Sequence, residues 1–449
     1  MALHRLRRFD IGGAHAALIT ALALCQRSAI EDHLDKKLLE YTTKLLASES
    51  PAFLSSYSFP KEVLPAFHGK LLGASYTEGV VQEASKTASL TEFILAKAHA
   101  PVLDARWKEW MDEEGSMHVK DKERVVHLMQ LFLLHKTLHT KPIKAILGED
   151  IYRALVTLQV LCETDAWTSA VSVQDSDATE GYVFATVALW PVDRGLLIAT
   201  DFESTCFADE TEPVMYLSED SLALASACPQ ENVGRLLDLC CGSGVQGIIA
   251  ARRYARSVTF VDANPRCIDF VRFNLALNSL SEKCDALVQR DIRHAGLDEY
   301  GSFSAMLVNP PFMPNPKNIA TGASLMFGNG GDSGEEVLSS AVRIAGRQLS
   351  SGGFLAAVSK VPNIRKFPAR LRAWWRTDLS ARSWVVHGAP VPARDYMPTA
   401  ISSGVEPVRY QQAMAEQGIE DLAQAVVFLT AGHASGPPLE VCLRETSHQ

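Results

Sequence analysis

The sequence lacks the signatures of several common protein classes. Its nine cysteines form no CxxC pair and no zinc-finger-like spacing with histidine, so a reduced, cytoplasmic setting fits best. His135 and His139 stand four residues apart without the glutamate of an HExxH motif, and no metal site is expected. The longest apolar runs, such as Ala16–Cys25, are about half as long as a membrane-spanning helix, so no membrane contact is expected. Because no GxSxG or Walker motif occurs, hydrolase and nucleotidase functions have no support.

The chain also lacks an excess of basic charge, since 43 lysines and arginines face 52 aspartates and glutamates, for a formal net charge of −9. A protein that binds nucleic acid over its whole surface is usually basic, so any such binding must be confined to a local patch. Basic residues surround Trp374 and Trp375 between Arg365 and Arg376. We interpret this segment as a helix with buried tryptophans and a solvated basic face.

The 449 residues are enough for two or three domains. Residues 1–165 have apolar side chains at helical spacing, which predicts an N-terminal helical domain that recognises the substrate. The expected helices are Ala16–Cys25, Asp32–Leu46, Leu90–His99, Lys122–Lys136 and Tyr152–Leu161. Residues 166–211 are expected to be a linker with a small β-hairpin, formed by Gly181–Trp190 and Gly195–Thr200.

Residues 212–449 alternate between strand-like and helix-like segments, which predicts an α/β domain with a mostly parallel sheet covered on both faces. A helix capped by Ser218 is expected before the first strand. The seven expected strands are Leu236–Cys240, Val258–Asp262, Ala286–Arg290, Ala305–Asn309, Phe354–Ser359, Trp384–His387 and Ala425–Leu429. A short final strand at Leu439–Leu443 is possible.

The stretch from Arg235 to Asp262 reads as a strand, a glycine-rich loop, a helix and a second strand. Glycines in the first turn let the backbone turn sharply and let a ligand approach where a Cβ would collide. The glycines are Gly242, Gly244 and Gly247. A carboxylate at the tip of the second strand, here Asp262, can accept hydrogen bonds from two ribose hydroxyls. The unit therefore predicts a cofactor that contains a nucleoside.

The identity of that cofactor is not determined by the glycine spacing, which also fits a dinucleotide fingerprint. Asp238 lies inside the first strand, where a carboxylate can reach the loop amides or, through water, the cationic end of a ligand. An NAD site has a pyrophosphate in this region and gains nothing from added negative charge. Asp262, Asp291 and Asn309 all fall at the carboxyl ends of expected strands, where α/β sheets bind ligands.

The fourth expected strand ends in Asn309-Pro310-Pro311-Phe312. Two prolines cannot continue a sheet ladder, so the chain leaves the sheet here and the loop is stiff. A rigid strand exit would explain this pattern by itself. Next to a nucleoside site, the same rigidity favours a functional loop that holds the Asn309 side chain and the Pro310 carbonyl in place.

With these motifs the sequence resembles the class I S-adenosylmethionine-dependent methyltransferases, which have a Rossmann-like sheet. It is most similar to the group with an Asn-Pro-Pro-aromatic loop, which includes glutamine methyltransferases of release factors and methyltransferases of rRNA guanine and of adenine amino groups. The resemblance spans about Val214–Leu429. It rests on LLDLCCGSGVQG, Asp262, Arg290-Asp291, NPPF, the glycine-aspartate segment Gly330–Gly334 and the later GGF.

The resemblance implies S-adenosylmethionine as cofactor. Asp262 would take the ribose hydroxyls, Asp291 the adenine amine, and Asp238 with the glycine loop would surround the methionine end. The other expected cofactor residues are Cys240, Gly242, Gly244, Ala263, Asn309 and Tyr216, the last of which, with Asp220, could close over the cofactor.

Asn309 and Pro310 would orient a planar acceptor nitrogen, and Phe312 would stack on the acceptor. The acceptor could be a protein glutamine, a nucleic-acid base or a metabolite. An NAD(P)-dependent oxidoreductase and a non-catalytic cofactor-binding scaffold stay open as alternatives.

Overall fold

The computed structural model describes residues 62–96, 100–113, 117–164, 181–202, 213–228, 232–320, 327–375, 377, 379–397, 405–434 and 438–446. The chain divides into two compact units, and the division falls after Thr205. Unit 1 comprises residues 1–205 with Ala276–Asn278, and unit 2 the rest. The described residues of the expected linker and hairpin, 181–202, fall in unit 1. None of the helices in these ranges is both long and apolar enough to cross a membrane.

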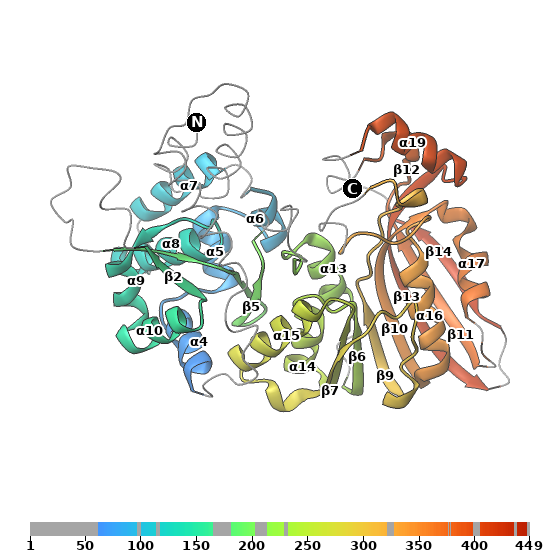
Figure 1. Ribbon diagram of the computed structural model, residues 1–449, viewed down its shortest axis with the longest axis horizontal. Helices are drawn as coiled ribbons and strands as arrows, with labels where there is room; N and C mark the ends of the chain where they lie inside the picture. The colour runs from blue at the N-terminus through green and yellow to red at the C-terminus, as the bar shows by residue number, and fades with distance from the viewer. Residues whose placement is uncertain are drawn as a thin grey trace, which may run out of the picture. The chain divides into compact units, whose positions relative to one another are not determined.

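Unit 1 is mainly helical in its described part (Figure 1). Its helices are α4 (Val63–Gly73), α5 (Glu78–Ser85), α6 (Leu90–Ala96), α7 (Ala100–Asp112), α8 (Val119–Phe132), α9 (Thr140–Leu147) and α10 (Glu149–Thr157). Three of them, α6, α8 and α10, correspond to expected helices. The expected helices at 16–25 and 32–46 lie outside the described residues. Apolar residues at helical spacing form the core, where the rings of Phe67 and Phe132 lie 6.0 Å apart.

Unit 1 also contains β-structure that the helical spacing did not predict. The strands β1 (Leu138–His139), β3 (Tyr182–Ala185) and β2 (Leu161–Thr164) form an antiparallel sheet in that order. The expected hairpin follows and is made of β4 (Ala188–Val192) and β5 (Leu196–Thr200). The single strand that we expected over Gly181–Trp190 is thus two strands. They separate at Thr186, whose hydroxyl donates to the Gln159 carbonyl at 2.7 Å.

Unit 2 is built on a sheet with the order β14-β11-β13-β10-β9-β6-β7-β8, and β12 pairs with β13. The strands are β6 (Val233–Leu239), β7 (Ala255–Asp262), β8 (Cys284–Gln289), β9 (Phe303–Val308), β10 (Leu349–Pro362), β11 (Leu379–His387), β12 (Val391–Pro392), β13 (Asp421–Ala434) and β14 (Glu440–Glu445). Every one of the seven expected segments forms a strand. The count of seven is wrong, because β12 and β14 make the sheet nine-stranded.

The sheet is mostly parallel, as expected, and β13 is the main exception. This strand lies between β10 and β11 and runs antiparallel to both. The parallel pairs β9–β10, β6–β9, β6–β7 and β7–β8 place the carboxyl ends of five neighbouring strands along one edge. Ligand-binding groups at those ends can therefore converge on one site.

Helices cover both faces of this sheet (Figure 1). They are α13 (Glu219–Ala227), α14 (Val245–Arg253), α15 (Pro265–Leu277), α16 (Glu336–Gln348) and α17 (Phe367–Trp374), and α19 (Pro407–Glu416) follows β12. Leu237 and Leu239 of β6 share a buried cluster with Val337 and Leu338 of α16. Because side chains alternate along a strand, Asp238 between them faces the opposite side, which α14 covers.

The basic segment around the two tryptophans forms the covering helix α17, as expected, but Trp374 is only half-buried. Trp375 is buried and its indole N–H donates to the Leu379 carbonyl at 3.1 Å. Arg370 donates to the buried carboxylate of Glu335 at 2.9 Å, which joins α17 to the start of α16. These side chains serve the packing of the domain.

Candidate functional site

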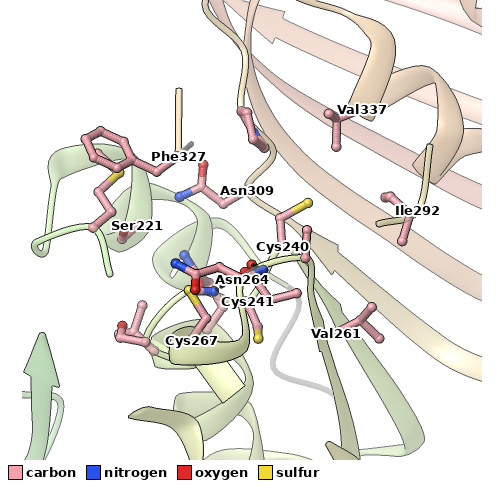
Figure 2. Close-up of a pocket in the computed structure, with 18 of the residues that line it drawn as sticks. Ser221, Cys240, Cys241, Val261, Asn264, Cys267, Ile292, Asn309, Phe327 and Val337 are labelled. Carbon is pink, nitrogen blue, oxygen red and sulfur yellow. Dashed lines mark hydrogen bonds between the residues drawn. The ribbon is translucent and has the colours of Figure 1, made fainter. Parts of the chain in front are cut away.

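A cleft opens at the carboxyl ends of β6, β7, β8 and β9 (Figure 2). Seven of the expected site residues line it, namely Tyr216, Cys240, Gly242, Asp262, Ala263, Asp291 and Asn309. Four others, Asp238, Gly244, Pro310 and Phe312, are absent from its lining. The structure thus brings together polar groups from four separate strand ends, and it places the remaining expected residues behind them.

The glycine loop runs from the end of β6 to the start of α14, and its glycines have different surroundings. A Cβ on Gly242 would have no atom within 4 Å, because this position faces open space in the cleft. A Cβ on Gly247 would lie 2.4 Å from the Phe260 ring and 2.7 Å from a carboxylate oxygen of Asp238. The first glycine leaves room for a ligand, and the second lets α14 approach the sheet closely.

Asp238 holds the glycine loop in place through a backbone hydrogen bond. Its side chain is buried, and Oδ2 accepts a hydrogen bond from the Gly247 backbone N–H at 2.8 Å. This contact satisfies one of the free N–H groups in the first turn of α14. Burial raises the pKa of the Asp238 carboxyl to about 7, and the hydrogen bond from Gly247 opposes that shift. The expected reach to a loop amide is confirmed, whereas contact with a ligand stays a prediction.

Asp262 ends β7 and is held by two backbone amides. Oδ2 accepts from the Gly242 N–H at 2.9 Å, and Oδ1 accepts from the Asn264 N–H at 2.9 Å. The pKa of this carboxyl is raised by burial, which the two amides partly oppose. The Cys267 thiol and the Ala263 N–H also donate to this carboxyl, which stays partly exposed to the cleft. The group is therefore fixed in orientation and still able to accept from a ligand in the cleft.

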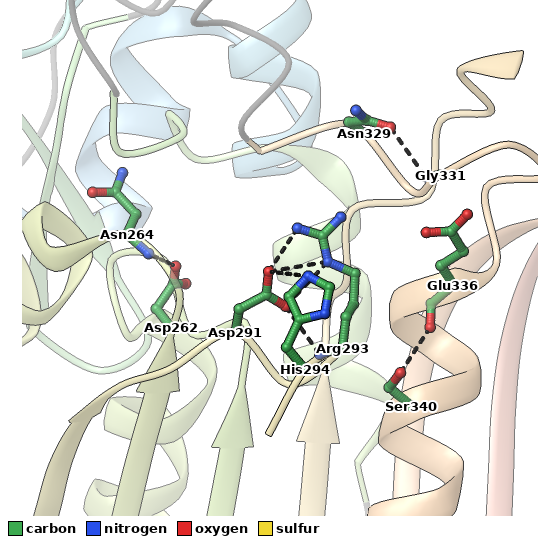
Figure 3. A network of polar contacts seen from close by, with 9 residues as sticks. All are labelled: Asp262, Asn264, Asp291, Arg293, His294, Asn329, Gly331, Glu336 and Ser340. Atoms are coloured by element: carbon green, nitrogen blue, oxygen red, sulfur yellow. Dashed lines mark hydrogen bonds and ion pairs between the residues drawn. The ribbon is translucent and has the colours of Figure 1, made fainter. Parts of the chain in front are cut away.

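Asp291 follows β8 and is paired with an arginine that the sequence analysis did not single out (Figure 3). Arg293 donates from Nη2 to Oδ2 at 2.7 Å and from its backbone N–H to Oδ1 at 2.9 Å. These hydrogen bonds hold the pKa of Asp291 below its usual range, so the carboxylate is ionised. The spacing of two residues between Asp291 and Arg293 was the only signal in the sequence.

Asn309 is the first residue after β9, and its half-buried side chain points into the cleft (Figure 2). Within the described part of the chain its amide has no hydrogen-bond partner, although neighbouring polar residues of the cleft have theirs. Pro310 is buried behind it, and Pro311 lines the cleft. A rigidly mounted amide that faces open space is suited to contact a ligand.

Phe312, the last residue of NPPF, packs against a cluster outside the cleft. That cluster contains Met313, Ala320, Ala393, Tyr396, Val405, Tyr410, Met414, Ile419 and Leu422. Phe327, which the sequence analysis did not identify, lines the cleft instead. Its only signal was an aromatic residue just before the glycine-rich segment.

The glycine-aspartate segment after NPPF holds that loop in place. The Met313 N–H donates to the Gly328 carbonyl at 2.7 Å, and the Gly330 N–H donates to the Met313 carbonyl at 2.9 Å. A Cβ on Gly334 would lie 2.6 Å from the Phe312 carbonyl oxygen. The glycines are needed because two stretches of backbone run in contact here.

The segment before α13 contributes Tyr216 to the cleft, and α13 itself contributes Ser221. Ser218 is the N-cap residue of α13, as expected, but its hydroxyl makes no cap hydrogen bond. Asp220, which we expected near the cofactor, instead accepts a hydrogen bond from Gln424 of β13 at 2.8 Å and is absent from the lining. The contact joins α13 to the sheet.

Comparisons with known proteins agree with this site. Residues 217–365 match the family model "Methyltransferase small domain". The chain is 34% identical over 85 residues to the ribosomal RNA large subunit methyltransferase K/L of Pseudomonas aeruginosa, which is 19% of this chain and 12% of that protein. It is 29% identical over 106 residues to the tRNA1(Val) (adenine(37)-N6)-methyltransferase of Shewanella sp. strain MR-7, covering 23% of this chain and 44% of the relative.

A third relative is a putative protein N5-glutamine methyltransferase of Methanocaldococcus jannaschii, 26% identical over 137 residues, or 30% of this chain and 66% of that one. The chain thus spans less than half the length of the first two relatives. Among solved structures, a putative SAM-dependent methyltransferase from Streptococcus mutans aligns over 54% of this chain and 55% of its own, with a TM-score of 0.32 and 13% identity. That alignment adds nothing to the strand order described above.

Proposed function

We propose that this chain, whose residues 217–365 form a methyltransferase small domain, transfers a methyl group from S-adenosylmethionine to a planar nitrogen. One observation supports this most directly. The amide of Asn309, which has no hydrogen-bond partner among the residues that the structure describes, faces the same cleft as the carboxylates of Asp262 and Asp291. Groups suited to a nucleoside and a group suited to an amine thus share one cavity.

The cleft residues fit the cofactor. Asp262 would accept from the ribose hydroxyls, and its two backbone hydrogen bonds already orient it for that contact. Asp291 would accept from the adenine amine. The open space beside Gly242 would admit the methionine portion. When bound, S-adenosylmethionine supplies a methyl group on a sulfonium that leaves as a neutral thioether.

The chain's own residues would orient the acceptor. An amide or aromatic amine nitrogen holds its lone pair in conjugation and is a poor nucleophile. If Asn309 Oδ1 and the Pro310 carbonyl each accept one N–H, the nitrogen lone pair is directed toward the methyl group. Two fixed acceptors also stabilise the positive charge that develops on the nitrogen in the transition state. Positioning of this kind can supply about 7–11 kcal/mol of the barrier reduction.

The names of two relatives suggest which kind of methyl acceptor this chain uses. They specify an adenine N6 and a glutamine N5, which are both planar nitrogens. The proposed acceptor is therefore an aromatic amine or a primary amide. We further propose that the helices of unit 1 select it and that the reaction takes place in the cytoplasm, where the cysteines of the chain would stay reduced.

The test combines binding and transfer. Titration calorimetry should show binding of S-adenosylhomocysteine and none of NADH, whereas the reverse result would indicate an oxidoreductase. Labelled methyl transfer to a cell extract, followed by nuclease or protease digestion, would identify the acceptor. A chain that binds S-adenosylhomocysteine but transfers no label to any fraction would be a cofactor-binding scaffold.

The variant that tests the role of Asn309 is Asn309→Ala. It should retain its affinity for S-adenosylhomocysteine and lose about a hundredfold to a thousandfold in transfer rate, which is typical for one preorganised polar group at a developing charge. Asn309→Asp keeps the shape and an acceptor oxygen but adds a negative charge beside the sulfonium. If only orientation of the acceptor matters, this variant should retain part of the transfer rate. If a neutral side chain is required, it should be nearly as slow as Asn309→Ala. If Asn309→Ala transfers methyl at the wild-type rate, the NPPF motif has no catalytic role and is only a rigid exit from the strand.

A further inference from the structure

Two aromatic side chains flank the point where the NPPF loop meets the glycine-rich segment. Phe312 directly precedes Met313, and Phe327 directly precedes Gly328. The Met313 N–H donates to the Gly328 carbonyl at 2.7 Å, and Met313 pairs with Asn329 in a parallel bridge, so the two phenylalanines lie on neighbouring paired segments, one residue out of register. Their side chains nevertheless have different surroundings, since Phe312 packs on the apolar cluster and Phe327 lines the cleft.

The backbone around Phe327 is firmly placed. Besides the bond to Gly328, the Gly330 N–H donates to the Met313 carbonyl at 2.9 Å, and the Asn315 N–H donates to the Gly331 carbonyl at 2.8 Å. A Cβ on Gly328 would lie 1.7 Å from the end of the Met313 side chain, so that side chain would have to move if another residue stood there. Phe327 therefore directly precedes a segment that backbone hydrogen bonds hold against the NPPF loop.

The position of Phe327 relative to Asn309 defines what can be held there. Both residues line the cleft, and Figure 2 shows the Asn309 amide directed toward the part that Phe327 borders. Phe327 is half-buried, so part of its side chain is accessible to a ligand. An acceptor whose N–H groups bonded Asn309 would bring its attached planar group beside this ring.

We infer that Phe327 is the aromatic residue on which the acceptor stacks, and that the acceptor is a heteroaromatic amine such as a nucleobase. This inference rests on the proposed function. A nucleobase presents a large π-face, and stacking on an aromatic side chain is worth about 1–3 kcal/mol per base, or roughly fivefold to 150-fold in affinity. A primary amide has a much smaller face and gains little from a ring over an aliphatic side chain.

Three variants test the inference, with RNA and protein fractions of a cell extract as acceptors and labelled S-adenosylmethionine as donor. Phe327→Leu keeps apolar bulk and loses the ring. It should raise KM for the RNA fraction about fivefold to 150-fold, in line with the loss of stacking, and leave S-adenosylhomocysteine affinity unchanged. Phe327→Trp, which keeps an aromatic ring, should have a KM close to that of the wild type. Phe312→Leu is the matched control, and it should lower thermal stability without changing KM.

Several outcomes would overturn the inference. If Phe327→Leu keeps the wild-type KM and Phe312→Leu raises it, the acceptor stacks on Phe312 and not on Phe327. Weaker S-adenosylhomocysteine binding by Phe327→Leu would make Phe327 a cofactor residue. Label found only in the protein fraction would exclude a nucleobase acceptor. Absence of transfer by the wild-type chain would instead refute the proposed function, so the two failures are distinguishable.

Discussion

Gly247→Ala is the sharpest test of how the glycine loop is built. The added methyl would lie 2.4 Å from the Phe260 ring and 2.7 Å from Asp238 Oδ2, and both side chains are buried. Neither can swing into solvent, so α14 must move away from the sheet. Overpacking of this kind costs about 1–3 kcal/mol. The hydrogen bond from Gly247 N–H to Asp238 would stretch, which costs about 1 kcal/mol more.

We therefore expect unit 2 of Gly247→Ala to lose about 2–4 kcal/mol of its free energy of unfolding, which is a shift in Tm of about 10 °C for a unit of this size. A chain with two units need not unfold in one step, so the assay should resolve them. Hydrogen exchange measured on peptides from β6, α14 and β7 reports unit 2. Peptides from α4 and α8 serve as an internal reference and should keep their exchange rates.

Two glycines provide matched controls. Gly242→Ala adds a methyl with no atom within 4 Å but at a φ of +53°, so it should cost only about 1–2 kcal/mol in stability and mainly reduce S-adenosylhomocysteine binding. Gly69→Ala lies within α4 with open space around it and should raise helix stability by about 0.5–1 kcal/mol. Unchanged exchange in α14 of Gly247→Ala would refute the close approach of this helix to β7.

The remaining predictions concern two carboxyls, the half-buried one of Asp262 and the buried one of Asp238. Asp262→Ala should weaken S-adenosylhomocysteine binding about tenfold to a hundredfold, the effect of losing a hydrogen bond to a charged group; unchanged affinity in calorimetry would remove Asp262 from the site. The raised pKa of Asp238, about 7, means that the native state holds a proton that the unfolded state releases near pH 4. Its contribution to stability is thus complete below about pH 4 and lost as the pH rises toward 7. Asp238→Asn, which keeps an acceptor for Gly247 N–H, should flatten that part of the unfolding free-energy profile, and a profile parallel to wild type would contradict the assignment.

Much of unit 2 could be predicted because its strands are short apolar runs with sharp ends. Asp262 and Asn309 could be placed at the sheet edge because each directly ends or follows such a run. The position of β13 could not be predicted in the same way. Local spacing shows that a segment is a strand, but the insertion between β10 and β11 depends on pairing between residues far apart in the chain.

The contents of the site were predictable to a similar extent. The glycine loop and the carboxylates have fixed spacings that reflect their chemistry. Arg293 and Phe327 have no such spacing, because their roles depend on where the chain folds back. The same is true of the pair of Glu335 and Arg370, which are far apart in sequence and join two helices.

The place of β13 in the sheet has a consequence for how the protein is made. A chain is synthesised from its N-terminus, so β10 and β11 leave the ribosome before β13, the strand that lies between them in the sheet. Until residues 421–434 are available, each of these strands presents an unpaired edge to its surroundings. Such edges are templates for pairing with other chains. A nascent or truncated chain that ends before β13 is therefore prone to aggregate, and chaperones would act on it at this stage of synthesis.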